Sequence, residues 1–533
     1  QRQMCIRDSR NEAGELEFNQ TKIGEENLTY KQTNKGYRSV YFEAVANWAR
    51  TFGKHDLSAM FLFQQSQKNY VGESANNSEK ALPYRHQGIA GRITYNYDNR
   101  YFVEGNFGYN GSENFSPNHR FGFFPSIAVG YVVSNEKFFA PIRDVVSMVK
   151  LKASYGLVGN DQIGGDRRFI YNETVIGGGK YYFGTTPSQY TSVRLGEFPN
   201  PNVGWEKAKK LNLGADLSFF NQLNISVDYF KENREGIFLQ RKSIPMYVGL
   251  STKPWVNIGK MRNSGIDASL EYHQPLGKDL HLTVRGNFTY ARNRIMDQDE
   301  PDYAYTYMNH SGQMQWQKFG LVAAGLFQDQ EDIDSWAKQS FGEVKPGDIK
   351  YLDLNGDGIV DNYDTKPIGY SDIPEIVYGF GFSLQWKAFD LSAFFQGVAH
   401  VSFSTLTDQT QAFVGRNLKE SSVFADLYGN TWTPENPGAK YPRMTTGAID
   451  NNNQLSTFWM ANGRYLRLKN LELGYTLPKR IANKIAMQSL RVYLSGVNLF
   501  TFSPFKLWDP DLQTGATNYP NNRIINLGLT IGF

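Results

Sequence analysis

The segment best suited to metal chemistry is DLNGDGIVDNYD, residues 353–364. It follows the spacing of a calcium loop, in which hard oxygen ligands recur at odd positions and surround one hard cation. Gly358 stands where such a loop turns sharply, and Ile359 would offer its backbone carbonyl. We expect a structural Ca²⁺ ion here, held by Asp353, Asn355, Asp357, Ile359, Asp361 and Asp364.

The last ligand position of this loop holds Asp364, where an EF-hand has glutamate, so the loop looks more like a dockerin-type loop. The shorter side chain reaches less far for bidentate ligation. The alternative is a polar surface turn without an ion. A bound ion would have modest affinity, roughly 10⁻⁴–10⁻³ M as in extracellular modules. It would stiffen a long loop and perform no chemistry.

Aromatic side chains gather in the same long stretch of chain. Aromatic faces stack on sugar rings and on peptide side chains. We therefore predict a substrate-binding role, with ordinary loop packing or a partner interface as the alternative, for Tyr303, Tyr305, Tyr307 and Trp316.

Catalytic constellations are not visible in the sequence. Its 7 histidines are scattered, and none belongs to an HExxH motif. The GGGK segment at residues 177–180 is followed by Tyr181, so it fails as a phosphate loop, and we expect a flexible loop there. The one cysteine, Cys5, excludes a disulfide framework within the chain. We predict that the protein is not an enzyme.

Composition narrows the class of protein. The net charge is +4, from 56 basic and 52 acidic residues, and no Lys/Arg-rich run occurs, so a nucleic-acid partner is not indicated. No apolar run reaches the roughly 18 residues that a membrane-spanning helix needs. Aromatic residues make up 15% of the chain and glycines number 50, which favours β-structure with tight turns.

The elements that must position these loops are strands, because apolar and polar residues alternate over long stretches. In residues 211–219, Leu211, Leu213 and Leu217 alternate with Asn212 and Asp216. Half-buried soluble strands alternate too, but they average about 5–6 residues, whereas tilted transmembrane strands need about 9–11. We predict strands near 39–52, 55–69, 87–98, 101–110, 121–135, 148–160, 204–220, 222–238, 258–275, 281–295, 374–387, 390–403, 464–479, 489–503 and 523–533, with a weak additional one near 24–34.

The connections between these strands alternate between short and long. This parity is typical of a transmembrane β-barrel with short periplasmic turns and long extracellular loops. Phe533 would then end the last strand on the periplasmic side. The predicted fold is an all-β, transmembrane antiparallel β-barrel spanning residues 11–533, with long extracellular loops near 161–203, 296–373 and 404–463. Residues 1–10 match nothing that follows, and we expect a non-native scar or a disordered segment.

Several stretches together resemble the SusC/RagA family of TonB-dependent outer-membrane transporters. They occur in the family's order and cover most of residues 148–533: LKASYGLVGND (151–161), NPNVGWEKAKKLNLGADLSFF (200–220), ISVDYFKENREGIF (225–238), GDIKYLDLNGDGIVDNYD (347–364), WTPENPGAKYPRM (432–444), ANGRYLRLKNLELGYTLP (461–478) and LRVYLSGVNLFTFS (490–503).

The resemblance implies a 22-stranded barrel, of which this chain supplies about 15–16 strands without the plug domain. It also implies import of oligosaccharides or peptides, a SusD-like surface lipoprotein as partner, and coupling to the TonB–ExbB–ExbD complex through a missing N-terminal part. Alternatives are a passive porin or adhesin-like barrel, a non-functional fragment of a transporter, and a secreted glycan-binding protein with a calcium loop. A barrel without plug and TonB box would favour the porin; solubility without detergent would favour the secreted protein.

Overall fold

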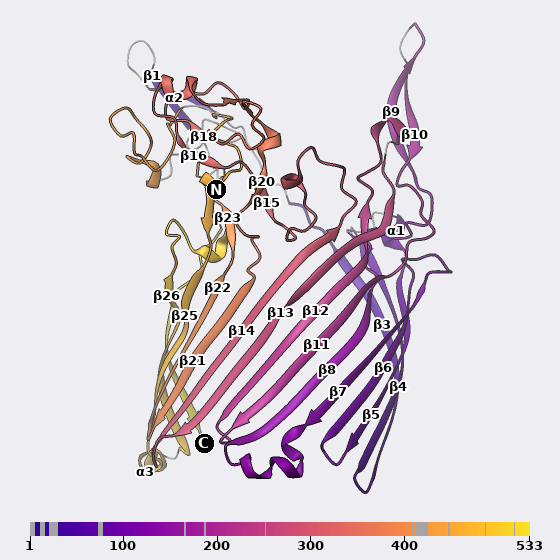
Figure 1. The fold of residues 1–533 in the computed structure, drawn as a ribbon, viewed down its shortest axis with the longest axis vertical. Coiled ribbons are helices and arrows are strands. Elements are labelled where there is room, and N and C mark those ends of the chain that lie inside the picture. Colours follow the sequence, from indigo (N-terminus) through magenta and orange to yellow (C-terminus); the bar gives the residue numbers. More distant parts are fainter. Residues whose placement is uncertain are drawn as a thin grey trace.

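One large antiparallel sheet dominates the computed structural model (Figure 1). Fifteen strands form it, in the order β27-β26-β25-β22-β21-β14-β13-β12-β11-β8-β7-β6-β5-β4-β3. The structure describes residues 6–10, 16–20, 30–72, 78–164, 167–185, 188–250, 252–407, 410–411, 425–445, 448–485, 487–515 and 518–533.

All fifteen strands of this sheet were predicted from the alternation, and the observed bounds differ from the predicted ones by a few residues. The strands are β3 (Lys35–Phe52), β4 (His55–Gly72), β5 (Tyr84–Tyr97), β6 (Tyr101–Ser112), β7 (Phe121–Val132), β8 (Val146–Asn160), β11 (Glu206–Phe219), β12 (Leu223–Gln240), β13 (Trp255–Pro275), β14 (Leu280–Asp297), β21 (Ile376–Trp386), β22 (Phe389–Ala399), β25 (Tyr465–Thr476), β26 (Ser489–Phe502) and β27 (Ile524–Gly532).

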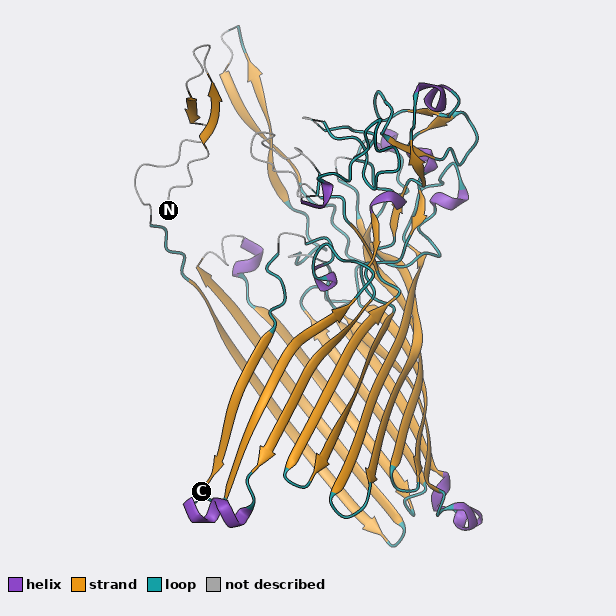
Figure 2. Ribbon diagram, turned by 90° about the vertical axis from the view of Figure 1, so that its left-hand side faces the viewer, coloured by secondary structure: helices purple, strands orange, loops and turns teal. Residues whose placement is uncertain are grey.

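The sheet curves into a wall whose strands run obliquely (Figure 2). Every neighbouring pair is antiparallel, and β3 and β27 stand at the two ends of the strand order. The register places apolar and aromatic residues opposite one another on neighbouring strands. Leu213, for example, lies opposite Tyr229, and Tyr229 lies opposite Ile266. No described helix is long and apolar enough to cross a membrane.

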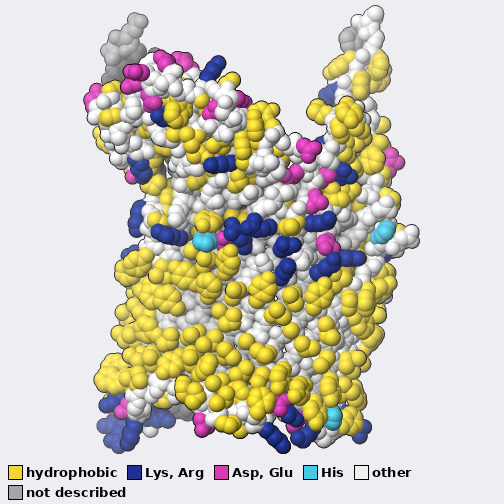
Figure 3. Space-filling model, in the orientation of Figure 1, with side chains coloured by type: hydrophobic (Ala, Val, Ile, Leu, Met, Phe, Trp, Pro, Cys, Tyr) yellow, Lys and Arg dark blue, Asp and Glu magenta, His cyan; other side chains and the backbone are white. Residues whose placement is uncertain are grey.

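The two faces of the wall differ because side chains alternate along each strand. One face carries exposed apolar side chains, among them Leu213, Ile266 and Leu527, and Figure 3 shows them as a broad apolar band. We call it the outward face. The opposite face carries charged networks, in which Lys152 Nζ lies 2.8 Å from Asp216 Oδ1 and 3.3 Å from Asp228 Oδ2.

Connections at one end of the wall are short. The β5–β6 turn places Asp98 and Asn99 at φ 53° and 52°, and the β11–β12 turn places Phe220 and Asn221 at φ 53° and 55°. Two successive left-handed residues are the signature of the two-residue hairpin turn that matches strand twist. Two connections at this end carry short helices instead: 3₁₀ turns at Val133–Asn135 and Lys137–Ile142, and α3 (Lys479–Ala482) followed by Asn483–Ile485.

The long connections all lie at the other end of the wall, as the predicted parity requires (Figure 2). They contain small elements: α1 (Ser78–Ala81), β9 (Val175–Phe183), β10 (Ser188–Leu195), β15 (Lys318–Gly320), β16 (Ala323–Leu326), α2 (Gln330–Asp334), β17 (Lys338–Gln339), β18 (Ile349–Tyr351), β19 (Ile359–Val360), β20 (Lys366–Ile368), β23 (Ser402–Ser404) and β24 (Met460–Asn462), with 3₁₀ turns at Met246–Val248, Thr306–Met308, Asn362–Asp364, Ala425–Leu427, Thr457–Trp459 and Pro510–Leu512.

Three expectations need comment. The GGGK segment at 177–180 is wrong as a flexible loop, because it lies within β9, which pairs with β10. The weak strand near 24–34 falls partly on residues 24–29, outside the described residues, and 30–34 carry no regular structure. Near the start of the chain, β1 (Ile6–Arg10) pairs with β2 (Leu16–Gln20), whereas the origin of residues 1–10 stays a prediction.

Candidate functional site in the long loops

The connections between β14 and β21 and between β22 and β25 pack into one unit, which we call the loop cap (residues 298–375 and the described part of 400–464). Its core consists of buried side chains from both connections: Leu321, Leu326, Ile349, Tyr351, Val360, Leu427, Tyr441 and Trp459. Both connections thus contribute side chains to one core, and packing between them stabilises the cap.

A buried carboxylate joins the two connections of the cap. Asp348 is 0% exposed, and its Oδ1 lies 2.8 Å from Arg443 Nε and accepts a 2.9 Å hydrogen bond from Asn452 Nδ2. Asn452 Oδ1 in turn accepts a 2.8 Å bond from the backbone N–H of Ile349. A buried charge needs such compensation, so this network fixes the relative position of the two connections.

The predicted calcium loop lies on this cap and is held in a turn by its own carboxylates. Asp364 is fully buried, and its oxygens accept bonds from the backbone N–H groups of Leu354 at 2.7 Å and Asp361 at 2.8 Å. Asp353 accepts from Gly356 at 2.7 Å and Gly358 at 2.8 Å. The backbone can turn this way because both glycines adopt positive φ, 78° and 84°.

The remaining predicted ligands also take part in hydrogen bonds within the loop. Asn355 Nδ2 donates to Asp357 Oδ2 at 3.0 Å, Ile359 N donates to Asp357 Oδ1 at 2.8 Å, and Asp361 Oδ1 accepts from Tyr363 N at 2.7 Å. Among the described residues, no three Asp, Glu, His or Cys side chains gather closely enough to hold a metal ion. The oxygen donors are of the type that Ca²⁺ prefers, and the same bonds suit the polar turn; calcium binding stays a prediction.

Two of the predicted aromatic residues rest directly on this loop. Tyr305 stacks on Tyr307, with ring centroids 5.4 Å apart, and meets the Tyr363 ring edge-on at 6.2 Å. The Tyr307 hydroxyl donates to the carbonyl of Tyr363 at 2.8 Å. Burial, followed by the nearby Asp364 charge, raises the pKa of Tyr307. The two predicted sites are therefore neighbours, which sequence spacing did not indicate.

The other two predicted aromatic residues lie apart from this stack. Tyr303 packs against the ring of His310 at 6.1 Å, and burial lowers the pKa of His310. Trp316 is 61% exposed and has φ 65°, a conformation that bulky residues rarely adopt. Of the four, Trp316 offers the most open aromatic face to a ligand.

The connection between β8 and β11, residues 161–205, forms a second unit, which we call the hairpin unit. Its base packs Ile163, Ile170 and Val203 against Phe115 and Phe238. Above this base the β9–β10 hairpin projects away from the wall (Figure 1). Its exposed apolar side chains are Val175, Ile176, Tyr181, Tyr182, Phe183, Tyr190, Val193 and Leu195.

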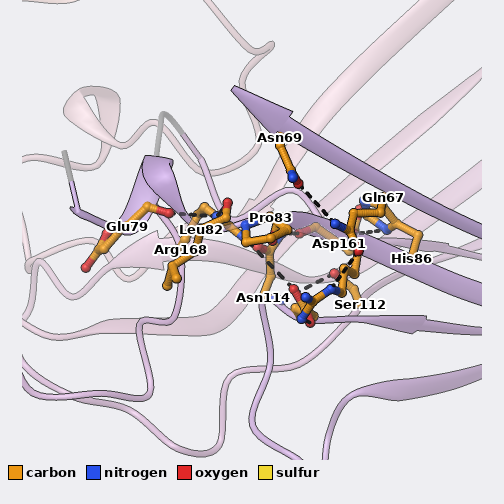
Figure 4. A network of polar contacts seen from close by, with 12 residues as sticks. Gln67, Asn69, Glu79, Leu82, Pro83, His86, Ser112, Asn114, Asp161 and Arg168 are labelled. Atoms are coloured by element: carbon orange, nitrogen blue, oxygen red, sulfur yellow. Dashed lines mark hydrogen bonds and ion pairs between the residues drawn. The ribbon is translucent and has the colours of Figure 1, made fainter. Parts of the chain in front are cut away.

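A buried arginine anchors the hairpin unit to its neighbour. Arg168 is 4% exposed, and its guanidinium donates to the carbonyls of Glu79 and Leu82 at 2.7 Å and of Pro83 at 2.8 Å (Figure 4). The same group lies 3.7 Å from the ring centroid of Tyr84. Close by, His86 Nδ1 lies 3.6 Å from Asp161 Oδ2. Arg168 thus helps to fix the position of α1 and its flanking loop.

Sequence reasoning missed Asp348, Arg168 and Asp299. Burial alone would raise the pKa of Asp299, but hydrogen bonds from Ser243, from the Lys242 N–H and from Arg241 lower it to about 2. Single polar residues in long loops give no pattern in the sequence, because their partners are distant along the chain.

A wall with one apolar and one charged face, bearing packed loops at one end, defines a membrane protein of the β-barrel class. The family model described as "TonB dependent receptor-like, beta-barrel" matches residues 7–499, and the chain belongs to this family. The family comprises receptors and transporters and is not an enzyme class. The chain is an outer-membrane protein, which removes the secreted alternative.

Two curated relatives illustrate the similarity. TonB-dependent receptor P3 of Formosa agariphila is 29% identical over 524 residues, covering 93% of this chain and 50% of the relative. TonB-dependent receptor SusC of Bacteroides thetaiotaomicron is 27% identical over 470 residues, covering 83% of this chain and 43% of the relative. The chain thus spans about half the length of the curated relatives it matches.

Solved structures agree on the fold. The RagAB peptide importer in its "open-open" state superposes with a TM-score of 0.71 at 21% identity, over 94% of this chain and 55% of the other. The RagAB peptide transporter superposes with a TM-score of 0.69 at 22% identity, over 94% and 56%. Together these matches confirm the predicted SusC/RagA relationship.

Proposed function

We propose that the intact protein is a TonB-dependent importer of oligosaccharides or peptides. The observation that carries the proposal is the fifteen-stranded wall, apolar outside and charged inside, in a chain of this receptor family. The charged inner face suits a hydrated path or the surface of a plug domain. The name of the RagAB peptide importer supports the peptide class, and the oligosaccharide class rests on the resemblance to the SusC/RagA family.

The proposed partners are a SusD-like surface lipoprotein on the long-loop side and the TonB–ExbB–ExbD complex on the periplasmic side. The β9–β10 hairpin supports the first, because its exposed aromatic side chains are of the kind that protein interfaces bury.

Within the loop cap, we propose that Trp316 and Tyr303 contact substrate, while Tyr305 and Tyr307 support the loop beneath it. Trp316 is well exposed, whereas Tyr305 and Tyr307 are engaged with Tyr363. Replacing Trp316 by Ala should lower substrate affinity, by about 1 kcal/mol for a lost stacking contact. Tyr428→Ala is the matched control, because Tyr428 is also exposed on the cap, at 87%.

Uptake in cells separates import from the passive-porin alternative. Cells carrying the intact protein are given labelled oligosaccharide or peptide, with and without a protonophore and with and without TonB. Active import predicts that uptake stops in both treatments. Uptake that continues at the same rate would favour the passive porin, and binding without uptake would favour an adhesin or a non-functional fragment.

We further propose that residues 353–364 bind Ca²⁺ and so stiffen the cap next to Tyr305 and Tyr307. The support is the set of oxygen-bearing side chains at calcium-loop spacing and the sharp turn at Gly358.

A further inference from the structure

Lysine and arginine side chains gather on the outward face of β11, β12, β13 and β14, near the long-loop ends of these strands. Figure 3 shows them as a row just above the apolar band. We call this set the cation belt; its members are Lys207, Lys209, Lys231, Lys260, Arg262, Arg292 and Arg294.

Strand register places the belt at the border of the apolar band. Lys209, Asn233, Arg262 and Arg294 follow one another across the four strands, and so do Leu213, Tyr229, Ile266 and Tyr290. The second row lies four residues farther along each strand, or about 13 Å, on the same face because the side-chain period is two. Between them, Lys231 and Arg292 are only two residues, about 7 Å, from Tyr229 and Tyr290. The belt therefore lies at the headgroup level of one leaflet.

Acidic partners are few in this belt. Lys209 pairs with Glu235 at 2.8 Å and Arg292 with Glu375 at 2.9 Å. Within the part of the chain that the structure describes, no carboxylate lies within ion-pair distance of Lys207, Lys231, Lys260, Arg262 and Arg294. The register does place Glu235 opposite both Lys207 and Lys260, and Asp297 opposite Lys260, so this row is partly compensated. Arg262 and Arg294, in contrast, lie directly opposite each other on neighbouring strands. Like charges in this position repel one another, so this part of the belt favours an external anion.

The same strands show no such belt at their other end. Their outward residues there are apolar or aromatic, for example Phe219, Leu223, Tyr272 and Leu282. A cation row that served only to reach water would be needed at both borders of the band. Exposed cations such as Lys278 do occur at the short-turn end, but on these four strands a row of outward cations stands at the long-loop border alone, which points to a ligand that one leaflet supplies. In this family the long loops face outward, so that leaflet is the outer one.

We propose that the cation belt binds the phosphate groups of anionic lipids in the outer leaflet. Guanidinium groups match phosphate with paired hydrogen bonds, and lysine adds compact positive charge. A lipid fits better than soluble phosphate because the belt borders the apolar surface on which acyl chains lie. The proposal rests on the outer-membrane location of the chain and is independent of transport.

The test measures lipid retained by the intact protein in nanodiscs of phosphatidylcholine with added phosphorylated glycolipid. Native mass spectrometry counts the bound glycolipid. The variant Lys231→Gln/Lys260→Gln/Arg262→Gln/Arg294→Gln should retain it about tenfold less than the wild type, because each interfacial cation contributes to anionic-lipid affinity. The control Arg50→Gln/Lys278→Gln/Arg480→Gln removes exposed cations at the short-turn end and should retain the wild-type amount.

Two further arms identify the ligand. With dephosphorylated glycolipid, the wild type and the belt variant should bind equally, and millimolar inorganic phosphate should not displace the phosphorylated lipid. Equal retention by the wild type and belt variant, or displacement by inorganic phosphate, would overturn the proposal. If the belt variant fails to fold, a salt titration of the wild type decides, because retention that does not fall with ionic strength is not electrostatic.

Discussion

The loop cap and the hairpin unit stand on the same wall, yet they treat apolar side chains in opposite ways. The cap buries Ile349, Tyr351 and Trp459 to 4% exposure or less. The hairpin unit buries a small base and leaves Val193 75% and Phe183 63% exposed on β9–β10. Both therefore start from apolar loops, but the cap shares an extended core between its two connections, whereas only the base of the hairpin unit packs against neighbouring residues.

The difference teaches that a long loop becomes a folded unit when another loop completes its core. The cap is built to keep its shape, because buried polar bonds cross between its two connections. The hairpin, in contrast, leaves its apolar side chains exposed to solvent. Exposed apolar area of this kind marks interaction sites in soluble proteins and in water-facing parts of membrane proteins.

The largest expected effect comes from Trp459→Ala in the cap core. Removing this side chain should lower the local free energy of unfolding by about 4 kcal/mol, since large-to-small core changes leave a cavity. Hydrogen exchange of residues 349–360 measures it. Val193→Ala in the hairpin is the control and should change the exchange there by less than about 0.5 kcal/mol. Equal effects at both positions would remove the distinction between the two units.

A somewhat smaller effect is expected from Asp348→Ala. The substitution removes the partner of Arg443 and of Asn452, and should cost about 3 kcal/mol because a buried charge loses its counter-charge. Faster exchange should appear in both connections of the cap and leave β9–β10 unchanged. Faster exchange confined to residues near 348 would show that Asp348 does not join the connections.

Asp299 ties the first residues of the cap to the connection between β12 and β13, and its effect depends on pH. Its pKa of about 2 lies below the ordinary value of 3.8, so its stabilisation is fully present above pH 4 and is lost as pH falls toward 2. The shift corresponds to about 2 kcal/mol. Relative to wild type, Asp299→Asn should speed exchange of residues 241–244 at pH 6, with the difference vanishing near pH 2. A difference that persists at pH 2 would assign the effect to hydrogen bonding of the neutral side chain.

The smallest expected effect tests the calcium loop. In millimolar Ca²⁺, Asp357→Ala should lower the stability of the intact protein by about 1 kcal/mol, the linkage expected for a weak site. In chelator the loss should be clearly smaller, limited to the bonds that Asp357 accepts from Asn355 and Ile359. An equal loss in both conditions would show that the loop binds no ion.

Strand positions in the main sheet could be predicted from the sequence because alternation is a local property. Leu213 and Asp216 report their faces through their immediate neighbours, whatever the rest of the chain does. The alternation of short turns and long connections likewise placed the loops at one end. The β9–β10 hairpin was not predicted, because the glycines at 177–179 suggested a loop. In the structure Thr191 pairs with Lys180 as a strand residue.

The candidate site was predicted only in part. The residue types of Tyr305 and Asp364 suggested their chemistry, but their contact through Tyr363 depends on how the loop folds back. Asp348 and Arg168 were not found, because nothing near them in the chain indicates burial.

The sequence by itself determined the wall: which residues form strands, which face meets lipid, and which end carries the loops. The physical reason is that successive side chains of a β-strand point to opposite faces of the sheet, so their polarity alternates when one face meets lipid and the other does not. Only the tertiary structure decided the loop cap, the exposed hairpin and the cation belt. The cap joins residues as distant as Ile349 and Asn452, 103 positions apart, and the belt assembles cations from four strands. Such contacts depend on the register and packing of the whole sheet.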